Sequence, residues 1–245
     1  MPDFQAVSDH ISRLEVPWRV FGPVAIPTAV WLVRERDGWT LVDAGPPESA
    51  DQVVAAVARA TNGQGPVRVV LTHGHYDHAG GLEALRLAWN PAILCHRQEV
   101  PLVTGQLDYR RLPSHSPAFW FGRLFFRRTR WAHPVARDLE GGLSVAGLVV
   151  IHLPGHTPGH VGFLHPEDRA MLCGDALMHL GGQLTPPSGL STPDPEAARA
   201  SIRRLGDMDF IHLLPGHGPA ILDRGHQAVE YALRRIEPSP AMDHW

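Results

Sequence analysis

The stretch from Leu71 to Gly81 concentrates side chains that bind metals and transfer protons. It reads LTHGHYDHAGG, and it places three histidines and an aspartate within six positions, after the apolar run VRVV. Neutral imidazoles and carboxylates are ligands of zinc and related transition metals. Such imidazoles repel one another once protonated and are costly to bury. The stretch therefore predicts a metal site.

Three further segments place an imidazole or a carboxylate at the end of a strand-like run. His156 follows VVIHLPG, Asp175 ends RAMLCGD, and His217 follows FIHLLPG. If these strand ends share one edge of the sheets, the ligand-type side chains converge there. The converging set is His73, His75, Asp77, His78, His156, Asp175 and His217.

This set exceeds what one tetrahedral zinc ion uses, because zinc takes four ligands and a catalytic site keeps one position open. Two metal ions fit better, and a carboxylate can bridge a pair about 3.5–4 Å apart. Residues two apart in an extended segment point the same way, so His73 and His75 can bind one ion. Asp77 and His78 can then serve the second.

The elements that must position these residues mix strands and helices along the chain. Strand-like runs lie at 13–16, 28–33 and 39–45, with later ones at 67–72, 92–96, 143–155, 160–165, 169–175 and 209–218. Helical patterns lie at 47–60, 80–89, 194–205 and 226–236, and Asp194 before Pro195 is a typical helix start. We expect one domain over residues 1–245, of class α/β (α+β), with two mixed sheets flanked by helices.

The motifs HGHYDH, PGHTPGH, CGD and PGHG, in this order, resemble those of the metallo-β-lactamase fold superfamily. The resemblance runs from LVDAG to PGHG and implies an αββα sandwich. It also implies that Asp43 supports the metal ligands from behind by orienting an imidazole. The implied ligands are His73, His75 and His156 for one ion and Asp77, His78 and His217 for the other, with Asp175 bridging them. We interpret His160 as a residue that braces its loop.

The resemblance implies hydrolysis of an ester, lactone or thioester of a small metabolite, the chemistry of class EC 3.1. Two divalent ions, zinc first with iron or manganese as alternatives, lower the pKa of a shared water from its high bulk value to about 7. The bridging hydroxide would attack the carbonyl, and Asp77 would pass a proton to the leaving group. Relatives with a bridging aspartate include glyoxalase II thioesterases, acyl-homoserine lactonases and phosphodiesterases.

Substrate choice rests on fewer residues. Quorum-type lactonases of the family commonly carry tyrosine three positions after the bridging aspartate, where this chain has Met178. Met178 and His179 are therefore candidate substrate contacts. Two alternatives share the fold: a phosphodiesterase, and a persulfide dioxygenase that holds one iron. A metal-stabilised binding module without catalysis is the least favoured reading.

The segment 105–137 interrupts the core pattern with arginines and aromatic residues. It carries Phe119, Trp120 and Phe121. It can be a lid over the site, a packed insertion or a helix lying on a membrane. We expect a lid, because long inserted segments in compact domains are often binding loops, and aromatic walls suit a partly apolar substrate.

Composition indicates which partners to expect. The formal net charge is −3, so nothing global favours a nucleic acid or a membrane surface over a small-molecule substrate. The two cysteines, Cys95 and Cys173, cannot build a disulfide framework, and the first residues lack a signal-peptide pattern. We expect a cytoplasmic protein, with its oligomeric state open and a homodimer as one option.

Overall fold

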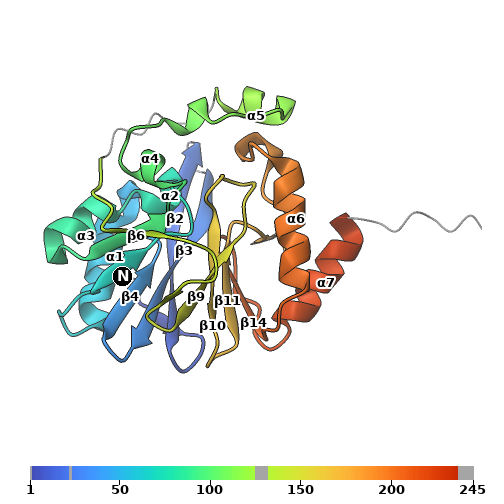
Figure 1. Ribbon diagram of the computed structural model, residues 1–245. Coiled ribbons are helices and arrows are strands. Elements are labelled where there is room, and N and C mark those ends of the chain that lie inside the picture. The colour runs from blue at the N-terminus through green and yellow to red at the C-terminus, as the bar shows by residue number, and fades with distance from the viewer. Residues whose placement is uncertain (1, 22–23, 125–131, 237–245) are drawn as a thin grey trace, which may run out of the picture.

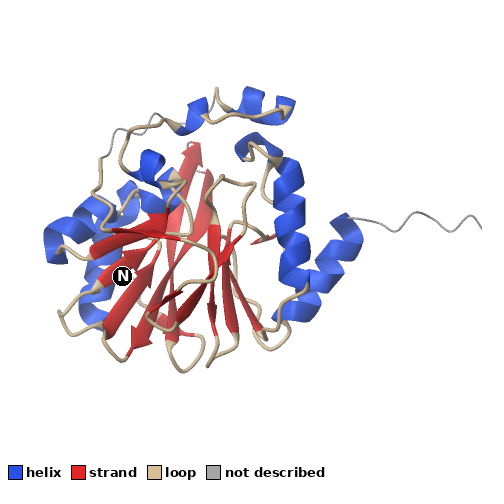
Figure 2. Cartoon of the chain, viewed as in Figure 1, coloured by secondary structure: helices blue, strands red, loops and turns tan. Residues whose placement is uncertain are grey.

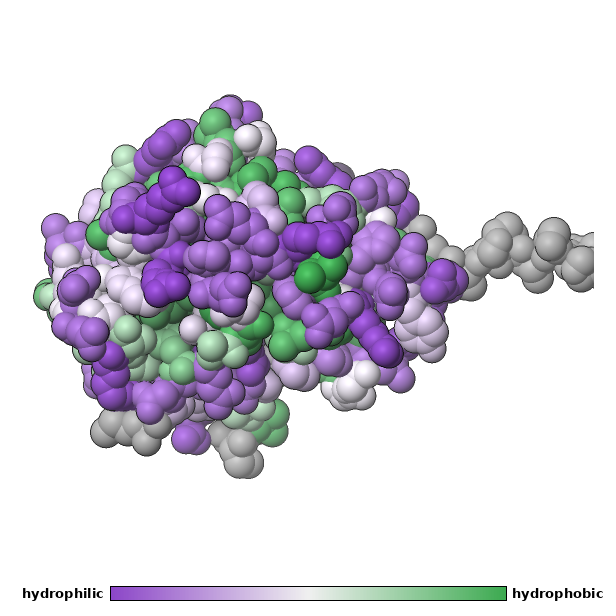
Figure 3. Space-filling view, turned by 90° about the horizontal axis from the view of Figure 1, so that it is seen from below, coloured by the Kyte–Doolittle hydropathy of each residue, from purple (hydrophilic) through white to green (hydrophobic). Residues whose placement is uncertain are grey.

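A computed structural model describes residues 2–21, 24–124 and 132–236 of this chain. Two sheets lie face to face, and helices cover the two outer faces (Figures 1 and 2). The αββα sandwich expected from the sequence is therefore confirmed. The face seen from below in Figure 3 carries hydrophilic side chains over most of its area. Among the described residues, no helix is long and apolar enough to cross a membrane.

The first sheet has its strands in chain order. They are β1 (Gln5–Ala6), β2 (Ile11–Phe21), β3 (Val24–Glu35), β4 (Gly38–Val42), β5 (Arg68–Val70), β6 (Ala92–His96) and β7 (Arg137–Leu139). The strands from β1 to β4 pair antiparallel, as the expected hairpins require, whereas β4 to β7 pair parallel. Strands β2 and β3 extend well beyond the short runs read from the sequence, because they pair along nearly their whole length.

The second sheet has the order β14-β11-β10-β9-β8. Its strands are β8 (Ser144–Val145), β9 (Leu148–His152), β10 (Val161–His165), β11 (Ala170–Gly174) and β14 (His212–Pro215). Strand β10 is antiparallel to both β9 and β11, and β11 is parallel to β14. The strands β9, β11 and β14 therefore run in the same direction and end at the same edge. A separate ribbon joins β12 (Met178–Leu180) and β13 (Gln183–Thr185).

The helices are mostly short. They are α1 (Ala50–Ala60), α2 (Tyr76–Ala79), α3 (Leu82–Trp89), α4 (Val100–Val103), α5 (Pro117–Gly122), α6 (Pro195–Gly206) and α7 (Gly225–Ile236), with 3-10 turns η1 (Pro47–Ser49), η2 (Tyr109–Arg111) and η3 (Gly189–Ser191). The predicted start of α6 is confirmed, since the Asp194 carboxylate accepts the N–H of Ala197 at 3.0 Å.

Three apolar layers hold the sandwich together. Trp31 and Phe163 lie in the layer between the two sheets. Val57 of α1 packs on the outer face of the first sheet, and Ile202 of α6 with Val229 of α7 packs on the outer face of the second. Because both faces of each sheet are covered, the strands are fixed in register, and the loops at their carboxyl ends are held against one another.

Candidate metal centre

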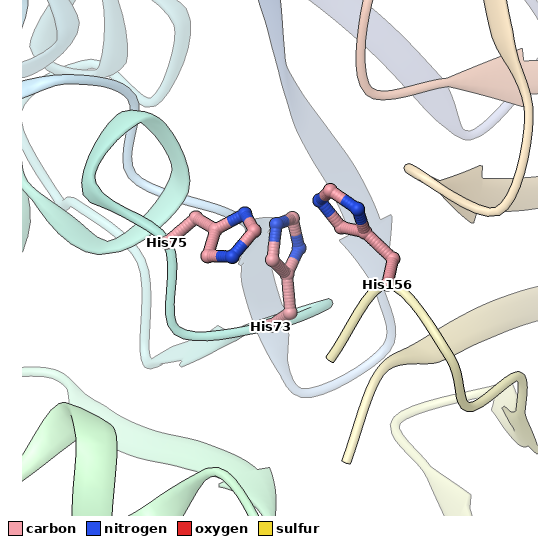
Figure 4. A group of neighbouring side chains, drawn as sticks. All are labelled: His73, His75 and His156. Atoms are coloured by element: carbon pink, nitrogen blue, oxygen red, sulfur yellow. The ribbon is translucent and has the colours of Figure 1, made fainter. Parts of the chain in front are cut away.

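The structure brings the seven expected ligand residues together at one edge of the sandwich. Each is at most 9% exposed. Figure 4 shows His73, His75 and His156 with their rings turned toward one another. Their ring centroids lie 4.4 Å (His73 to His75), 4.9 Å (His73 to His156) and 4.5 Å (His75 to His156) apart. One nitrogen atom from each of the three rings lies within 4.8 Å of the corresponding nitrogen atoms of the other two.

A second group lies beside the first and contains Asp77, His78 and His217. The Oδ2 of Asp77 is 3.4 Å from His78 Nε2 and 3.1 Å from His217 Nε2. Asp175 faces both groups: its Oδ1 is 3.4 Å from His78 Nε2, and its Oδ2 is 3.4 Å from His156 Nε2 and 3.2 Å from His217 Nε2. Two ligand atoms that each lie about 2.0–2.2 Å from one tetrahedral ion are separated by distances similar to these oxygen–nitrogen distances.

The backbone explains how one short motif serves both groups. The segment after β5 is extended through His75, which has φ −71° and ψ 158° and precedes the first turn of α2. Asp77 and His78 lie within α2, so they face a different direction from the extended residues. The segment then turns closely against the end of β4, where a Cβ on Gly81 would lie 2.1 Å from the carbonyl oxygen of Ala44. Glycine is required at that close approach.

Hydrogen bonds select the tautomer of the ligand-type imidazoles. His217 Nδ1 donates to the Pro27 carbonyl at 3.0 Å, and His78 Nδ1 donates to Asp43 Oδ2 at 2.8 Å. A carbonyl and an ionised carboxylate can only accept, so both Nδ1 atoms carry hydrogen. In the neutral, metal-binding form of each ring, the Nε2 atom, which faces the carboxylates of the site, is then the unprotonated nitrogen.

The same logic holds for two further rings. The Thr72 hydroxyl donates to Asp43 Oδ2 at 2.8 Å, so at 3.0 Å it can only accept from His73 Nδ1. The Thr192 hydroxyl donates to the Ser188 carbonyl, so it accepts from His156 Nδ1 at 3.3 Å. Among the described residues, no donor reaches Nε2 of His73 or Nε2 of His156, and the latter faces Asp175 Oδ2 at 3.4 Å. Buried acceptor nitrogens that converge without a donor fit a metal ion.

His160 has the opposite tautomer. Its Nε2 accepts the main-chain N–H of Asp175 at 2.9 Å, so its Nδ1 carries the hydrogen. This contact joins the loop after β9 to the end of β11, which agrees with the bracing role expected for this residue.

A second cluster of ligand-type groups, His10, His165 and Asp168, lies outside the predicted set. The Nδ1 of His165 accepts the main-chain N–H of Asp168 at 3.1 Å, so its Nε2 carries hydrogen and donates rather than binds. His10 Nδ1 lies 2.7 Å from Asp168 Oδ1, as in an ordinary ion pair. We interpret this cluster as a hydrogen-bonded network and not as a metal site.

The charges around the site shift the pKa values of its histidines. Burial by itself lowers the pKa of His217, but Asp175 and Asp77 more than offset this effect and raise the pKa to about 10. In the same way, Asp77, Asp175 and Asp43 overcome burial and raise the pKa of His78. Burial and the neighbouring imidazoles lower the pKa of His73 and of His75. The carboxylates thus stabilise positive charge at this site, and divalent ions supply such charge.

Asp43, expected to support the ligands, is 1% exposed and lies behind them. Its Oδ1 accepts the N–H of Thr72 at 2.8 Å, while its Oδ2 accepts from the Thr72 hydroxyl and from His78. One carboxylate therefore reaches His78 directly and His73 through Thr72.

Two residues near the site were missed by sequence reasoning. Glu99 is fully buried, and its two oxygens accept the main-chain N–H groups of Gly74 and Gly159. Tyr109 lies edge-on to His75 with ring centroids 4.2 Å apart, and its hydroxyl donates to the Ser191 carbonyl at 2.5 Å. Neither residue belongs to a motif or follows a predicted strand directly, so no spacing signal marked them.

The candidate substrate residues take different positions. Phe119 is 0% exposed and lies in a buried cluster with Tyr109, so its side chain packs and does not line an open site. Trp120 and Phe121 are 56% and 57% exposed, and the Trp120 indole N–H donates to the Ser114 carbonyl at 3.1 Å while the Arg123 guanidinium lies over its ring. His179 Nδ1 donates to the Pro219 carbonyl at 2.8 Å, just after His217. Met178, at the start of β12, is half-buried.

The described part of the segment 105–137 packs against the loop that carries Thr192. The Ser114 hydroxyl donates to the Pro193 carbonyl at 2.5 Å. A Cβ on Gly122 would lie 2.0 Å from the Leu190 carbonyl oxygen, so α5 and η3 are in close contact. The segment therefore supports the loop that orients His156. Residues 125–131, with the remaining aromatic residues and arginines, lie outside the described residues.

Residues 24–217 match the profile of the metallo-beta-lactamase superfamily, and the chain belongs to this family. It is 31% identical over 208 residues to "Probable metallo-hydrolase YflN" of Bacillus subtilis, covering 77% of this chain and 78% of that protein. It is 31% identical over 154 residues to "Hydroxyacylglutathione hydrolase GloC" of Haemophilus influenzae, covering 61% of this chain and 68% of that protein.

Among solved structures, the chain resembles TTHA1623 in a di-iron-bound form, with 31% identity and a TM-score of 0.63. That match covers 87% of this chain and 96% of the other. Family, fold and the His/Asp groups together support a metal-dependent hydrolase that uses divalent ions.

Proposed function

We propose that this protein is a dinuclear metal-dependent hydrolase that cleaves an ester, lactone or thioester bond in a small metabolite. The observation that carries this proposal is the position of Asp175, whose two oxygens lie 3.2–3.4 Å from imidazoles of both ligand groups. A carboxylate that faces two ligand groups is suited to bridge two ions.

The donor set fits two divalent ions. His73, His75 and His156 would hold one, Asp77, His78 and His217 the other, and Asp175 would contact both. When bound, such ions polarise a carbonyl group and lower the pKa of a water molecule. Zinc suits these imidazole and carboxylate ligands, and iron and manganese are alternatives. The similarity to a protein solved with two irons supports iron as a candidate.

The side chains of this protein contribute orientation and proton transfer. The hydrogen bonds at Nδ1 of His73, His78, His156 and His217 fix the direction of each Nε2. Fixed ligands reduce the reorganisation that the reaction would otherwise require. Asp77 is the residue we assign to pass a proton to the leaving group, because its carboxylate lies inside the site between His78 and His217.

The carbonyl bond is the preferred target for two reasons. The similarity to a hydroxyacylglutathione hydrolase supports a thioester among the candidate substrates. In addition, the exposed rings of Trp120 and Phe121 suit the partly apolar acyl part of such a substrate.

A substrate panel tests the proposal. An aliphatic ester, a lactone, a thioester and a phosphodiester are assayed with the purified protein, after metal removal by a chelator, and after zinc is restored. We expect hydrolysis of at least one carbonyl substrate, its loss on chelation and its recovery with zinc. Asp175→Ala should lower the rate by orders of magnitude, whereas Asp209→Ala, at an 85% exposed side chain, should not. Cleavage of the phosphodiester alone, or oxygen uptake with a persulfide, would refute carbonyl hydrolysis.

A further inference from the structure

Glu99 connects the two loops that carry the three imidazoles of Figure 4. It lies just before α4, at its N-cap position, and is 0% exposed. Its Oε2 accepts the N–H of Gly74 at 2.8 Å, and its Oε1 accepts the N–H of Gly159 at 2.8 Å. Gly74 lies between His73 and His75, and Gly159 lies three residues after His156. A single carboxylate therefore ties both ligand loops to one point.

The fit around this carboxylate is close. A Cβ on Gly159 would lie 2.8 Å from Glu99 Oε1, and a Cβ on Gly74 would lie 3.2 Å from Glu99 Oε2. Both loops thus approach the carboxylate with their main chains, where no side chain intervenes. Burial raises the pKa of Glu99, and the Thr157 side chain and the N–H groups of Gly74 and Gly159 act in the opposite direction by stabilising the charged form. A buried carboxylate of this kind is costly unless its hydrogen bonds define a structure.

The other ligand group has different supports. Asp43 orients His78, and the Pro27 carbonyl orients His217. Within the described part of the chain, the hydrogen bonds of Glu99 reach the loops of His73, His75 and His156, and none reaches the ring of His78 or His217. Its position predicts an effect on one ion and not on both.

We propose that Glu99 is a positioning residue that sets the spacing of His73, His75 and His156 and thereby the affinity of one of the two metal ions. This inference rests on the proposed function, because it requires ions at the site. Glu99 acts through the main chain of the ligand loops and is not itself a ligand.

The test is a competition between the zinc-loaded protein and a chromophoric zinc chelator, which counts the ions and measures how tightly each is held. Glu99→Gln keeps the shape of the side chain but turns an NH2 group toward one of the two N–H donors. We expect one ion to be held about 10–100-fold more weakly than in the parent, the usual scale for outer hydrogen-bond partners of ligands, and the other ion to be unchanged. Glu83→Gln, at a surface carboxylate paired with Arg86, is the matched control and should match the parent.

A second variant approaches the same contact from the loop. Gly159→Ala places a methyl group 2.8 Å from both Glu99 Oε1 and His96 Nδ1 and should weaken the same single ion. This variant decides the question if Glu99→Gln does not fold. The cobalt-substituted proteins give an independent readout, because a changed ligand geometry alters the visible absorption of one of the two ions. If the parent holds two ions and both variants hold them equally tightly with unchanged spectra, the inference on Glu99 is wrong. If the parent itself holds no ion, the proposed function fails instead.

Discussion

Replacing Asp43 with asparagine would remove the charge behind two ligand imidazoles without straining the chain. Asp43 has φ 63°, and asparagine adopts this left-handed conformation as readily as aspartate. Alanine at this φ would add strain of about 1–2 kcal/mol and would mix two effects. The amide variant therefore isolates the contribution of the carboxylate.

The size of the effect follows from the three hydrogen bonds that Asp43 accepts, each 2.8 Å long. The amide oxygen of asparagine can accept at one side, but its NH2 group faces at least one donor at the other. A hydrogen bond to a charged group contributes about 1.5–3 kcal/mol. Since about 1.4 kcal/mol is a factor of ten in affinity, loss of one bond predicts zinc binding weaker by about 10–100-fold.

The assay is again chelator competition, with melting of the metal-free protein measured in parallel. Asp43 reaches His78 directly and His73 through Thr72, so both ions should be weakened, in contrast to the single ion expected for Glu99→Gln. Asp37→Asn, at an exposed carboxylate paired with Arg68, is the control. Unchanged affinity for both ions in Asp43→Asn would refute the reasoning about Asp43.

Three other perturbations separate packing, bracing and charge. Phe119→Ala should destabilise the fold by about 3–5 kcal/mol without altering substrate preference. Trp120→Ala should instead shift the preference among acyl-chain lengths at an unchanged melting temperature. A changed preference in Phe119→Ala, with only a lower melting temperature in Trp120→Ala, would contradict this assignment. His160→Ala should lower activity while the protein retains two ions by elemental analysis, and loss of an ion would show that His160 is a ligand. Asp168 raises the pKa of His10, and the hydrogen bonds that Asp168 accepts lower its own pKa although burial opposes this. The charged or titratable groups around the pair include Glu167, His165 and Arg34. The pair should therefore stabilise the fold fully between about pH 4 and pH 6.5, and it should lose its effect as the pH rises through the raised pKa of His10 or falls through the lowered pKa of Asp168. Accordingly, His10→Gln should lower the melting temperature at pH 5.5 by about 2 °C and leave it unchanged at pH 9; equal losses at both values would refute the ion pair.

Much of the site was predictable because its residues follow strands. The ends of β9, β11 and β14 lie at one edge of the second sheet. The residues that follow these ends therefore lie at the same edge, and they include His156, Asp175 and His217. The close spacing within HGHYDH predicted the other ligand residues, because an extended segment followed by a helical turn directs its side chains toward two neighbouring points.

Other features depend on tertiary contacts that leave no local pattern. Glu99 lies in a helical-looking stretch, and only the arrival of Gly74 and Gly159 from distant parts of the chain gives its carboxylate a role. Phe119 and Trp120 are adjacent and of similar type, yet one is buried and the other exposed. The six residues of α5 show no periodicity that would predict which face docks on η3.

Metal content tests the central claim most directly. The protein is purified without added metal, and its zinc, iron and manganese are measured per chain by elemental analysis, alongside the Asp175→Ala variant. Two ligand groups joined by Asp175 predict about two ions per parent chain and fewer in the variant. A single iron per chain in the parent, unchanged in the variant and accompanied by oxygen uptake with a persulfide, would contradict a dinuclear hydrolase.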